Sequence, residues 1–152
     1  MKSGYVPAVG TPLDKDGNLC IESYKKQIED QIAQGAIAIL SMGSMGIQPY
    51  MRTSVCPDVA KTAIEAAAGR VPVYVGAMDC SISRARERMA AMEDLDIAGS
   101  VLTTPYYYAC TPQMIINYYK GACAGTKHEV LMYDLAVVTQ SKITYEIVKE
   151  LI

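Results

Sequence analysis

Short apolar runs alternate along the chain with longer segments in which apolar residues recur every three or four positions. The apolar runs predict five strands, at Tyr5–Val9, Ala36–Leu40, Val71–Val75, Ser100–Thr103 and Val130–Tyr133. Because the strands alternate with helical segments, they indicate βαβ units joined by right-handed crossovers. A continuous run such as AIAIL is typical of a parallel strand that is covered on both faces.

Helices are predicted after each of these strands from apolar positions that share one face. Gly35 stands where the C-terminal glycine of the first helix belongs, and Ser81 and Thr111 are expected N-caps. The expected helices start near Ile21, Pro57, Ser81, Thr111 and Thr144, and the first four end near Gly35, Ala68, Asp94 and Ala122.

Five βα units allow two architectures within one domain of 152 residues. They fit a complete doubly wound sheet of the flavodoxin type, or part of an eight-unit TIM (β/α)8 barrel. The length favours the doubly wound sheet. The last residues, Val148–Ile152, stop within an amphipathic pattern and have no polar cap, which instead predicts a truncated domain.

Composition narrows the classes of partner. The formal net charge is −2 and the charges are scattered, so no basic stripe predicts nucleic-acid binding. No apolar run approaches the roughly 20 residues that span a bilayer, and the start lacks a signal-peptide pattern, so no membrane partner and a cytoplasmic location are expected. The five cysteines form no CxxC pair and predict reduced thiols; no metal or cofactor is expected.

The loop SMGSMG, residues 41–46, follows a predicted strand end, where ligands of parallel α/β proteins bind. Its spacing matches neither phosphate-binding glycine motif and does not match GxSxG. Gly43 and Gly46 would let the backbone turn so that the N–H groups of Ser44 and Met45 bind an anion. An ordinary tight turn is the alternative.

Tyrosines follow two other predicted strand ends, in TPYYY (Thr104–Tyr108) and at Tyr133. A phenol in such a place can relay a proton. The chain has 11 tyrosines but no phenylalanine or tryptophan, so these rings could equally serve for packing.

Taken together, these segments resemble the dihydrodipicolinate synthase and N-acetylneuraminate lyase family of pyruvate-dependent class I aldolases. The start TPLDKDGNLCIESYKKQI, the loop GSMG, the segments GRVPVYVGA and TPYYY, and LMYDLA resemble successive motifs of that family. The resemblance covers Tyr5–Ile152. It implies an eight-unit βα barrel, of which this chain would hold about five units, and a homo-oligomer, either a tetramer or a dimer.

The resemblance also implies a mechanism in which a lysine on the sixth strand forms a Schiff base with pyruvate or another 2-oxo acid. No sixth strand is expected here, and Lys142 and Lys149 would lie around the last helix, so the chain alone is expected to be inactive. Tyr133 would shuttle protons, and Ser44 would connect it to Tyr107, which would reach a neighbouring subunit's site. The N–H groups of Ser44 and Met45 would hold the pyruvate carboxylate.

Several positions depart from the family motifs. Met45 replaces a threonine, Ile47 a glutamate and Asp134 an asparagine, and residues 137–140 lack the arginine that dihydrodipicolinate synthases carry at the mouth of the site. These departures favour a 2-oxo acid lyase other than dihydrodipicolinate synthase proper. A non-catalytic barrel relative that binds a small carboxylate, or that serves a structural role, is the alternative.

Overall fold

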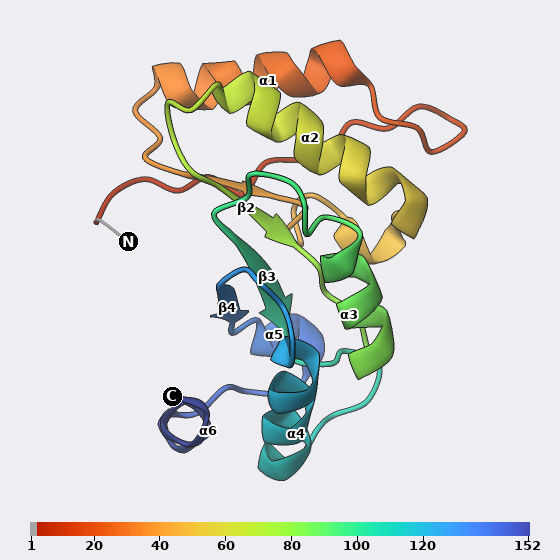
Figure 1. Cartoon of the computed structure of the whole chain (residues 1–152), viewed down its shortest axis with the longest axis vertical. Helices are drawn as coiled ribbons and strands as arrows, with labels where there is room; N and C mark the ends of the chain where they lie inside the picture. The colour runs from red at the N-terminus through yellow and green to blue at the C-terminus, as the bar shows by residue number, and fades with distance from the viewer. Residues whose placement is uncertain (1–2) are drawn as a thin grey trace.

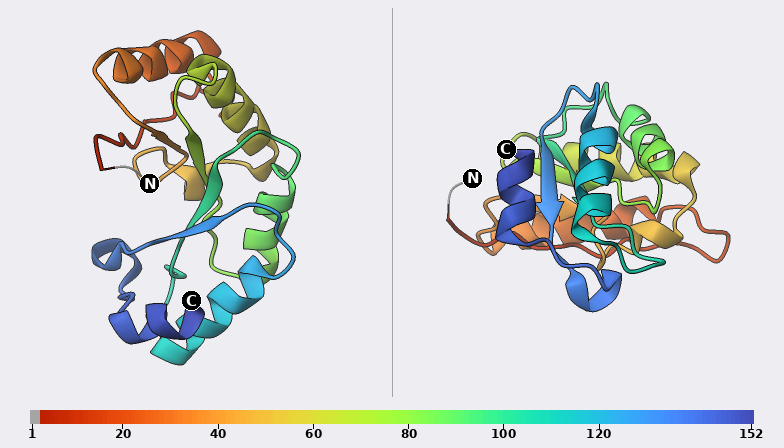
Figure 2. Two further views of the ribbon diagram at one scale, coloured as in Figure 1. Left: turned by 60° about the vertical axis from the view of Figure 1, so that its left-hand side comes forward. Right: turned by 90° about the horizontal axis from the view of Figure 1, so that it is seen from below.

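The computed structural model describes residues 3–152 as a parallel sheet with helices around its outer side (Figures 1 and 2). The strands are β1 (Ile39–Ser41), β2 (Val73–Gly76), β3 (Gly99–Thr103) and β4 (Val130–Tyr133). The helices are α1 (Ile21–Ala33), α2 (Cys56–Ala67), α3 (Ile82–Ala90), α4 (Pro112–Cys123), α5 (Ala136–Thr139) and α6 (Tyr145–Leu151), with short 3-10 turns at Gln48–Tyr50 and Thr53–Val55.

The order of the strands decides between the two predicted architectures. All neighbours are parallel and the sheet runs β1-β2-β3-β4 in chain order. A doubly wound sheet must reverse its direction of growth, whereas a βα barrel adds each strand beside the previous one. The fold is therefore a partial TIM barrel, which confirms the architecture that the resemblance implied and excludes the flavodoxin-like sheet that length alone favoured.

The first predicted strand, Tyr5–Val9, is reduced to an extended segment beside β1. The amide of Ile37 donates to Tyr5 O at 2.9 Å, and the amide of Val9 donates to Leu40 O at 3.0 Å. Only Ala8 forms a bridge, with Leu40. Pro7 has no N–H group to donate, which interrupts the ladder at this point.

Helix ends follow the predicted capping residues closely. Ser81 Oγ accepts a bond from the amide of Arg84 at 3.3 Å, and Thr111 Oγ1 accepts one from the amide of Met114 at 3.4 Å. Gly35 has a φ of 91°, as expected for a residue that ends a helix. Helix α3 ends at Ala90 rather than near Asp94, because i→i+3 bonds tighten the chain there. The single turn of α5 was not predicted.

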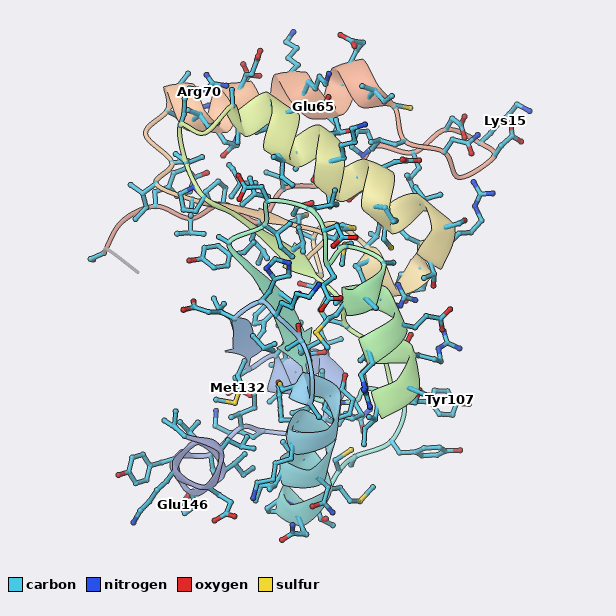
Figure 3. The ribbon with its side chains drawn as sticks, in the orientation of Figure 1. Lys15, Glu65, Arg70, Tyr107, Met132 and Glu146 are labelled. Atoms are coloured by element: carbon cyan, nitrogen blue, oxygen red, sulfur yellow. The ribbon has the colours of Figure 1, made fainter. Side chains whose placement is uncertain are left out.

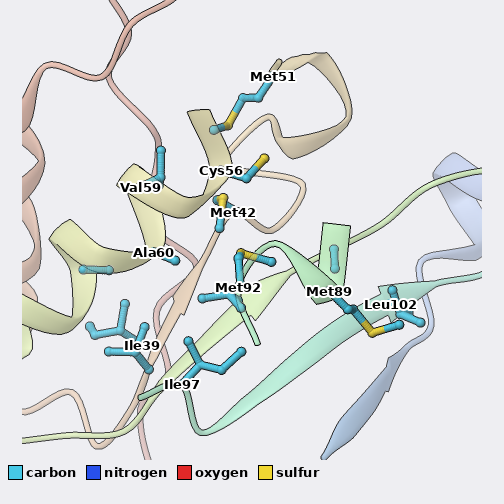
Figure 4. Packing of buried hydrophobic residues seen from close by; sticks show 14 of the residues in the cluster. Ile39, Met42, Met51, Cys56, Val59, Ala60, Met89, Met92, Ile97 and Leu102 are labelled. Atoms are coloured by element: carbon cyan, nitrogen blue, oxygen red, sulfur yellow. The ribbon is translucent and has the colours of Figure 1, made fainter. Parts of the chain in front are cut away.

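Methionine fills much of the space between the sheet and the helices. Met42, Met51, Cys56 and Met92 are at most 5 % exposed and gather where α2 covers the sheet (Figure 4). Unbranched thioethers fit irregular gaps, which suits a core without phenylalanine or tryptophan. No helix within residues 3–152 is long and apolar enough to cross a membrane.

Candidate functional site

The loop after β1 turns at residues that differ from the predicted ones. The left-handed backbone conformations fall on Met42, with a φ of 53°, and Ile47, with a φ of 51°, rather than on Gly43 and Gly46. A Cβ atom at Gly46 would lie 2.8 Å from Met42 Cα. The glycine at position 46 thus serves close approach within the loop, while the bulkier residues carry the backbone strain.

Two contacts hold this loop across the carboxyl end of the sheet. Thr11 Oγ1 donates a buried hydrogen bond to Gly46 O at 2.8 Å. A Cβ atom at Gly76, at the end of β2, would lie 1.8 Å from Met42 O, so only glycine permits this approach. The loop is therefore fixed by its surroundings, and not free to adjust as a surface turn would be.

The backbone donors of the loop lack partners. Within residues 3–152 the amides of Ser44 and Met45 donate to no protein acceptor, and both residues are exposed, Met45 by 66 %. Unpaired N–H groups in a tight turn form a concave donor surface of the kind that binds anions. The structure thus leaves these two N–H groups without a protein acceptor.

Ser44 and Tyr133 meet at the mouth of the partial barrel. Ser44 Oγ lies 3.3 Å from Tyr133 OH, which joins the loop after β1 to the end of β4 across 89 residues of sequence. Tyr133 pairs in register with Thr103, and this places its phenol at the carboxyl end of the sheet. Either hydroxyl can donate, so the pair can pass a proton in either direction.

Tyr107 lies apart from this pair. Its side chain is 75 % exposed and contacts the ring of Tyr108 edge to face, with ring centroids 4.8 Å apart. Figure 3 shows it at the margin of the molecule, pointing away from the sheet. Within residues 3–152 it makes no hydrogen bond to Ser44 or Tyr133. A single chain therefore gathers two of the three predicted relay residues.

A buried ion cluster near the same end of the sheet was not predicted. Asp79, which is 3 % exposed, accepts bonds from Arg84 Nε at 3.0 Å, Arg88 Nε at 3.1 Å and the amide of Cys80 at 2.7 Å. Tyr118 OH donates to the Asp79 carbonyl at 2.8 Å. The available signal was two arginines four residues apart, on one helix face, just after an aspartate.

The surroundings of this cluster raise the pKa of a nearby phenol, that of Tyr106. Burial is the main cause that raises the pKa of Tyr106 to about 12, and the neighbouring Cys80 and Asp79 add to it. Tyr106 is therefore protonated at neutral pH. The carboxylate of Asp79 has partners on several sides, so it is suited to holding the loop after β2 in place.

Asp134, at the position of the family asparagine, holds Lys142. Asp134 Oδ1 accepts a bond from the amide of Ile143 at 3.1 Å, and Oδ2 accepts one from Lys142 Nζ at 3.1 Å. The bond from Ile143 is the main cause that lowers the pKa of Asp134, and Lys142 adds to it. The ammonium of Lys142 is thus directed to the surface by an ion pair, as expected for a lysine outside the barrel.

The strand order and this mouth define a class: a segment of a parallel βα barrel that carries a hydroxyl pair and a donor loop at its carboxyl end. Comparison with known families then shows to which family of such barrels the chain belongs. The model of the dihydrodipicolinate synthetase family matches residues 1–152, and the chain belongs to that family.

Curated relatives agree with this assignment. The 4-hydroxy-tetrahydrodipicolinate synthase of Shewanella sp. (strain W3-18-1) is 30% identical over 152 residues, which is 100% of this chain and 52% of the relative. The enzyme of the same name from Escherichia coli O139:H28 is 30% identical over 135 residues, 89% of this chain and 46% of the relative. The chain spans about half the length of these relatives.

Solved structures show the same fold. Dihydrodipicolinate synthase from Acinetobacter baumannii, complexed with pyruvate, is 27% identical with a TM-score of 0.90, covering 97% of this chain and 51% of the other. A prophage protein of the family from E. coli K12, also in complex with pyruvate, is 25% identical with a TM-score of 0.88, covering 96% and 49%.

Proposed function

We propose that this chain is part of a Schiff-base-forming lyase or aldolase that acts on pyruvate or another 2-oxo acid. The observation that carries the proposal is the Ser44–Tyr133 hydroxyl pair beside the open N–H groups of Ser44 and Met45. Support for pyruvate as the ligand comes from the two relatives of this family that were solved with it.

In this proposal each group has a separate task. The N–H groups of Ser44 and Met45 bind the carboxylate, and Tyr133 transfers protons to and from the Schiff base, with Ser44 as its partner. Tyr107 projects toward the site of a second copy in a cytoplasmic homo-oligomer, either a dimer or a tetramer. The resemblance to the family implies that the Schiff-base lysine lies on the sixth strand of the barrel. Of the lysines near the end of this chain, Lys142 is paired with Asp134 and Lys149 lies on α6.

Borohydride trapping tests the proposal. Pyruvate and borohydride added to the full-length protein should give a covalent adduct on one lysine, detected as a mass increase. The 152-residue chain should give none under the same conditions. A full-length protein that gains no mass would contradict the proposed activity, and a stoichiometric adduct on this chain would show that the lysine is misplaced.

A second candidate is a non-catalytic barrel that binds a small carboxylate or has a structural role. It is favoured by the exposed apolar side chains of Met45 and Ile47 at the loop where the family has polar residues. The two candidates separate in one experiment, in which pyruvate binding to the full-length protein is measured by calorimetry before borohydride is added. Binding without an adduct supports the binder.

A further inference from the structure

Both ends of the loop that carries Tyr107 are bonded to the segment that follows β4. At its start, Thr104 Oγ1 lies 2.8 Å from Thr139 Oγ1 and 3.1 Å from the carbonyl oxygen of Ser141. At its end, the amide of Cys110 donates to Ser141 Oγ at 2.8 Å. We call Thr104, Thr139 and Ser141 the hydroxyl cluster; they are 1 %, 1 % and 3 % exposed.

The hydroxyl cluster satisfies its own hydrogen bonds. Thr139 Oγ1 lies 3.1 Å from Ser141 O and 3.3 Å from Leu135 O, so the protons of both threonines have carbonyl or hydroxyl acceptors. A buried polar network with every member paired is rigid and specific. Gln140, between Thr139 and Ser141, has a φ of 55°, and this left-handed conformation turns the chain between the two residues.

Tyr107 has little else to fix its position. Its side chain is 75 % exposed, and Tyr108, its aromatic partner within residues 3–152, is 74 % exposed and lies on the same loop. The direction in which Tyr107 projects therefore depends on where the loop begins and ends. Both ends of the loop are hydrogen-bonded to residues that lie within eight positions of Tyr133 along the chain.

We propose that the hydroxyl cluster fixes the direction in which Tyr107 projects, by holding both ends of its loop to the segment that follows Tyr133. Thr104, Thr139 and Ser141 are positioning residues, since their hydroxyls are buried and bonded to other parts of the chain. The mechanical link is the set of hydrogen bonds that joins the Tyr107 loop to the segment after β4, and it does not depend on the proposed function. The catalytic meaning of this link, its effect on proton transfer, rests on the proposed function.

Hydrogen exchange on the 152-residue chain tests the mechanical link. In Ser141→Ala and Thr139→Val, exchange of the Cys110 amide, which donates to Ser141 Oγ, should become about fivefold faster or more, the effect of one lost hydrogen bond. Thr139→Ser should restore the original rates. The matched control is Thr62→Val, which removes a buried hydroxyl bonded to Asp58 O at 2.7 Å on α2.

The control distinguishes a local link from general destabilisation. Thr62→Val should leave exchange in residues 104–110 unchanged relative to the rest of the chain. Exchange of the Cys110 amide at the original rate in both cluster variants would overturn the proposal. So would an equal acceleration of the loop in Thr62→Val.

Proton exchange at the methyl group of pyruvate, followed by NMR in the full-length protein, tests the catalytic meaning. Thr139→Val should slow this exchange about tenfold, as for a misplaced catalytic group, while the borohydride-trapped adduct reaches its usual extent. Thr139→Ser should return the rate to nearly that of the unmodified protein. Unchanged exchange in Thr139→Val would refute the positioning role. An unmodified protein without an adduct would instead refute the proposed function, and the hydrogen-exchange experiment would still decide the mechanical link.

Discussion

Two polar sites at the carboxyl end of the sheet, Asp79 and the Ser44–Tyr133 pair, differ in burial and in hydrogen bonding. Asp79 is buried and accepts three donors at 2.7 to 3.1 Å, whereas Ser44 and Tyr133 are partly open to solvent and share one contact of 3.3 Å. A saturated, buried group holds structure, while a loosely paired, accessible one is free to accept a ligand. The difference shows that proximity to the mouth does not by itself make a residue part of the chemistry.

The largest loss of stability is expected from Arg88→Met. It leaves the buried carboxylate of Asp79 without one of its charged partners and should lower the free energy of unfolding by about 3–5 kcal/mol. Chemical denaturation of the purified chain measures this. The control Lys120→Met breaks the exposed Lys120–Glu150 pair, 2.8 Å apart, and should lower stability far less, because solvent screens this pair. Equal losses of stability in the two variants would contradict the distinction between the buried Asp79–Arg88 pair and the exposed Lys120–Glu150 pair.

A smaller loss is expected from Tyr24→Phe. Tyr24 OH lies 2.7 Å from Ser41 Oγ in the core, so the variant leaves a buried hydroxyl unpaired and should lose about 1–3 kcal/mol. The control Tyr145→Phe, on an exposed ring, should change stability by less than about 0.5 kcal/mol.

The raised pKa of Tyr24 also predicts that the stability of the fold depends on pH in the alkaline range. Burial raises its pKa to about 12 in the folded chain from an ordinary value of 10.0. The unfolded chain therefore loses this proton first, and stability falls as the pH rises above 10 toward 12. Tyr24→Phe should flatten part of that fall in denaturation series at increasing pH. An unchanged slope would mean that Tyr24 ionises equally in both states.

Asp134→Asn should have a weaker effect on stability, and this effect should depend on pH in the acidic range. The folded pKa of Asp134 is lowered, so its stabilising effect is present above its ordinary value of 3.8 and is lost as the pH falls through the folded value. The variant should be less stable at pH 7 by under about 1 kcal/mol, because the pair with Lys142 is open to solvent. A stability difference that persists unchanged in acid would point to another cause.

The smallest effect on stability is expected from Ser44→Ala, within about 0.5 kcal/mol of the unmodified chain. In the full-length protein the same change should slow proton exchange of pyruvate by about tenfold or more, since it removes the hydroxyl that faces Tyr133. Ser83→Ala, on the surface of α3, is the control for both measurements. A large stability loss in Ser44→Ala would place this hydroxyl with Asp79, among the groups that hold structure.

Features set by local sequence were predictable. Ser81 and Thr111 cap helices because a hydroxyl beside the first turn meets free N–H groups whatever the rest of the fold. The meeting of Ser44 and Tyr133 was also predictable, since the carboxyl ends of parallel strands share one edge and the family motifs mark both residues.

Features set by distant packing were not predictable. The left-handed turn falls on Met42 because its carbonyl lies against Gly76, a contact between residues 34 positions apart. The hydrogen bonds that hold the two ends of the Tyr107 loop, Thr104–Thr139 and Cys110–Ser141, join residues 35 and 31 positions apart. Periodicity and capping describe neighbours within one element and contain no information about such pairs.

The order of the strands has a consequence for how the chain folds. Within residues 3–152, β2, β3 and β4 each pair with the strand that precedes it in the sequence, so these pairings need no segment from later in the chain. Loop-closure entropy is lowest for such pairings, which favours rapid folding for a parallel sheet. The barrel can therefore grow in the direction of synthesis, with each finished βα unit serving as the template on which the next one docks.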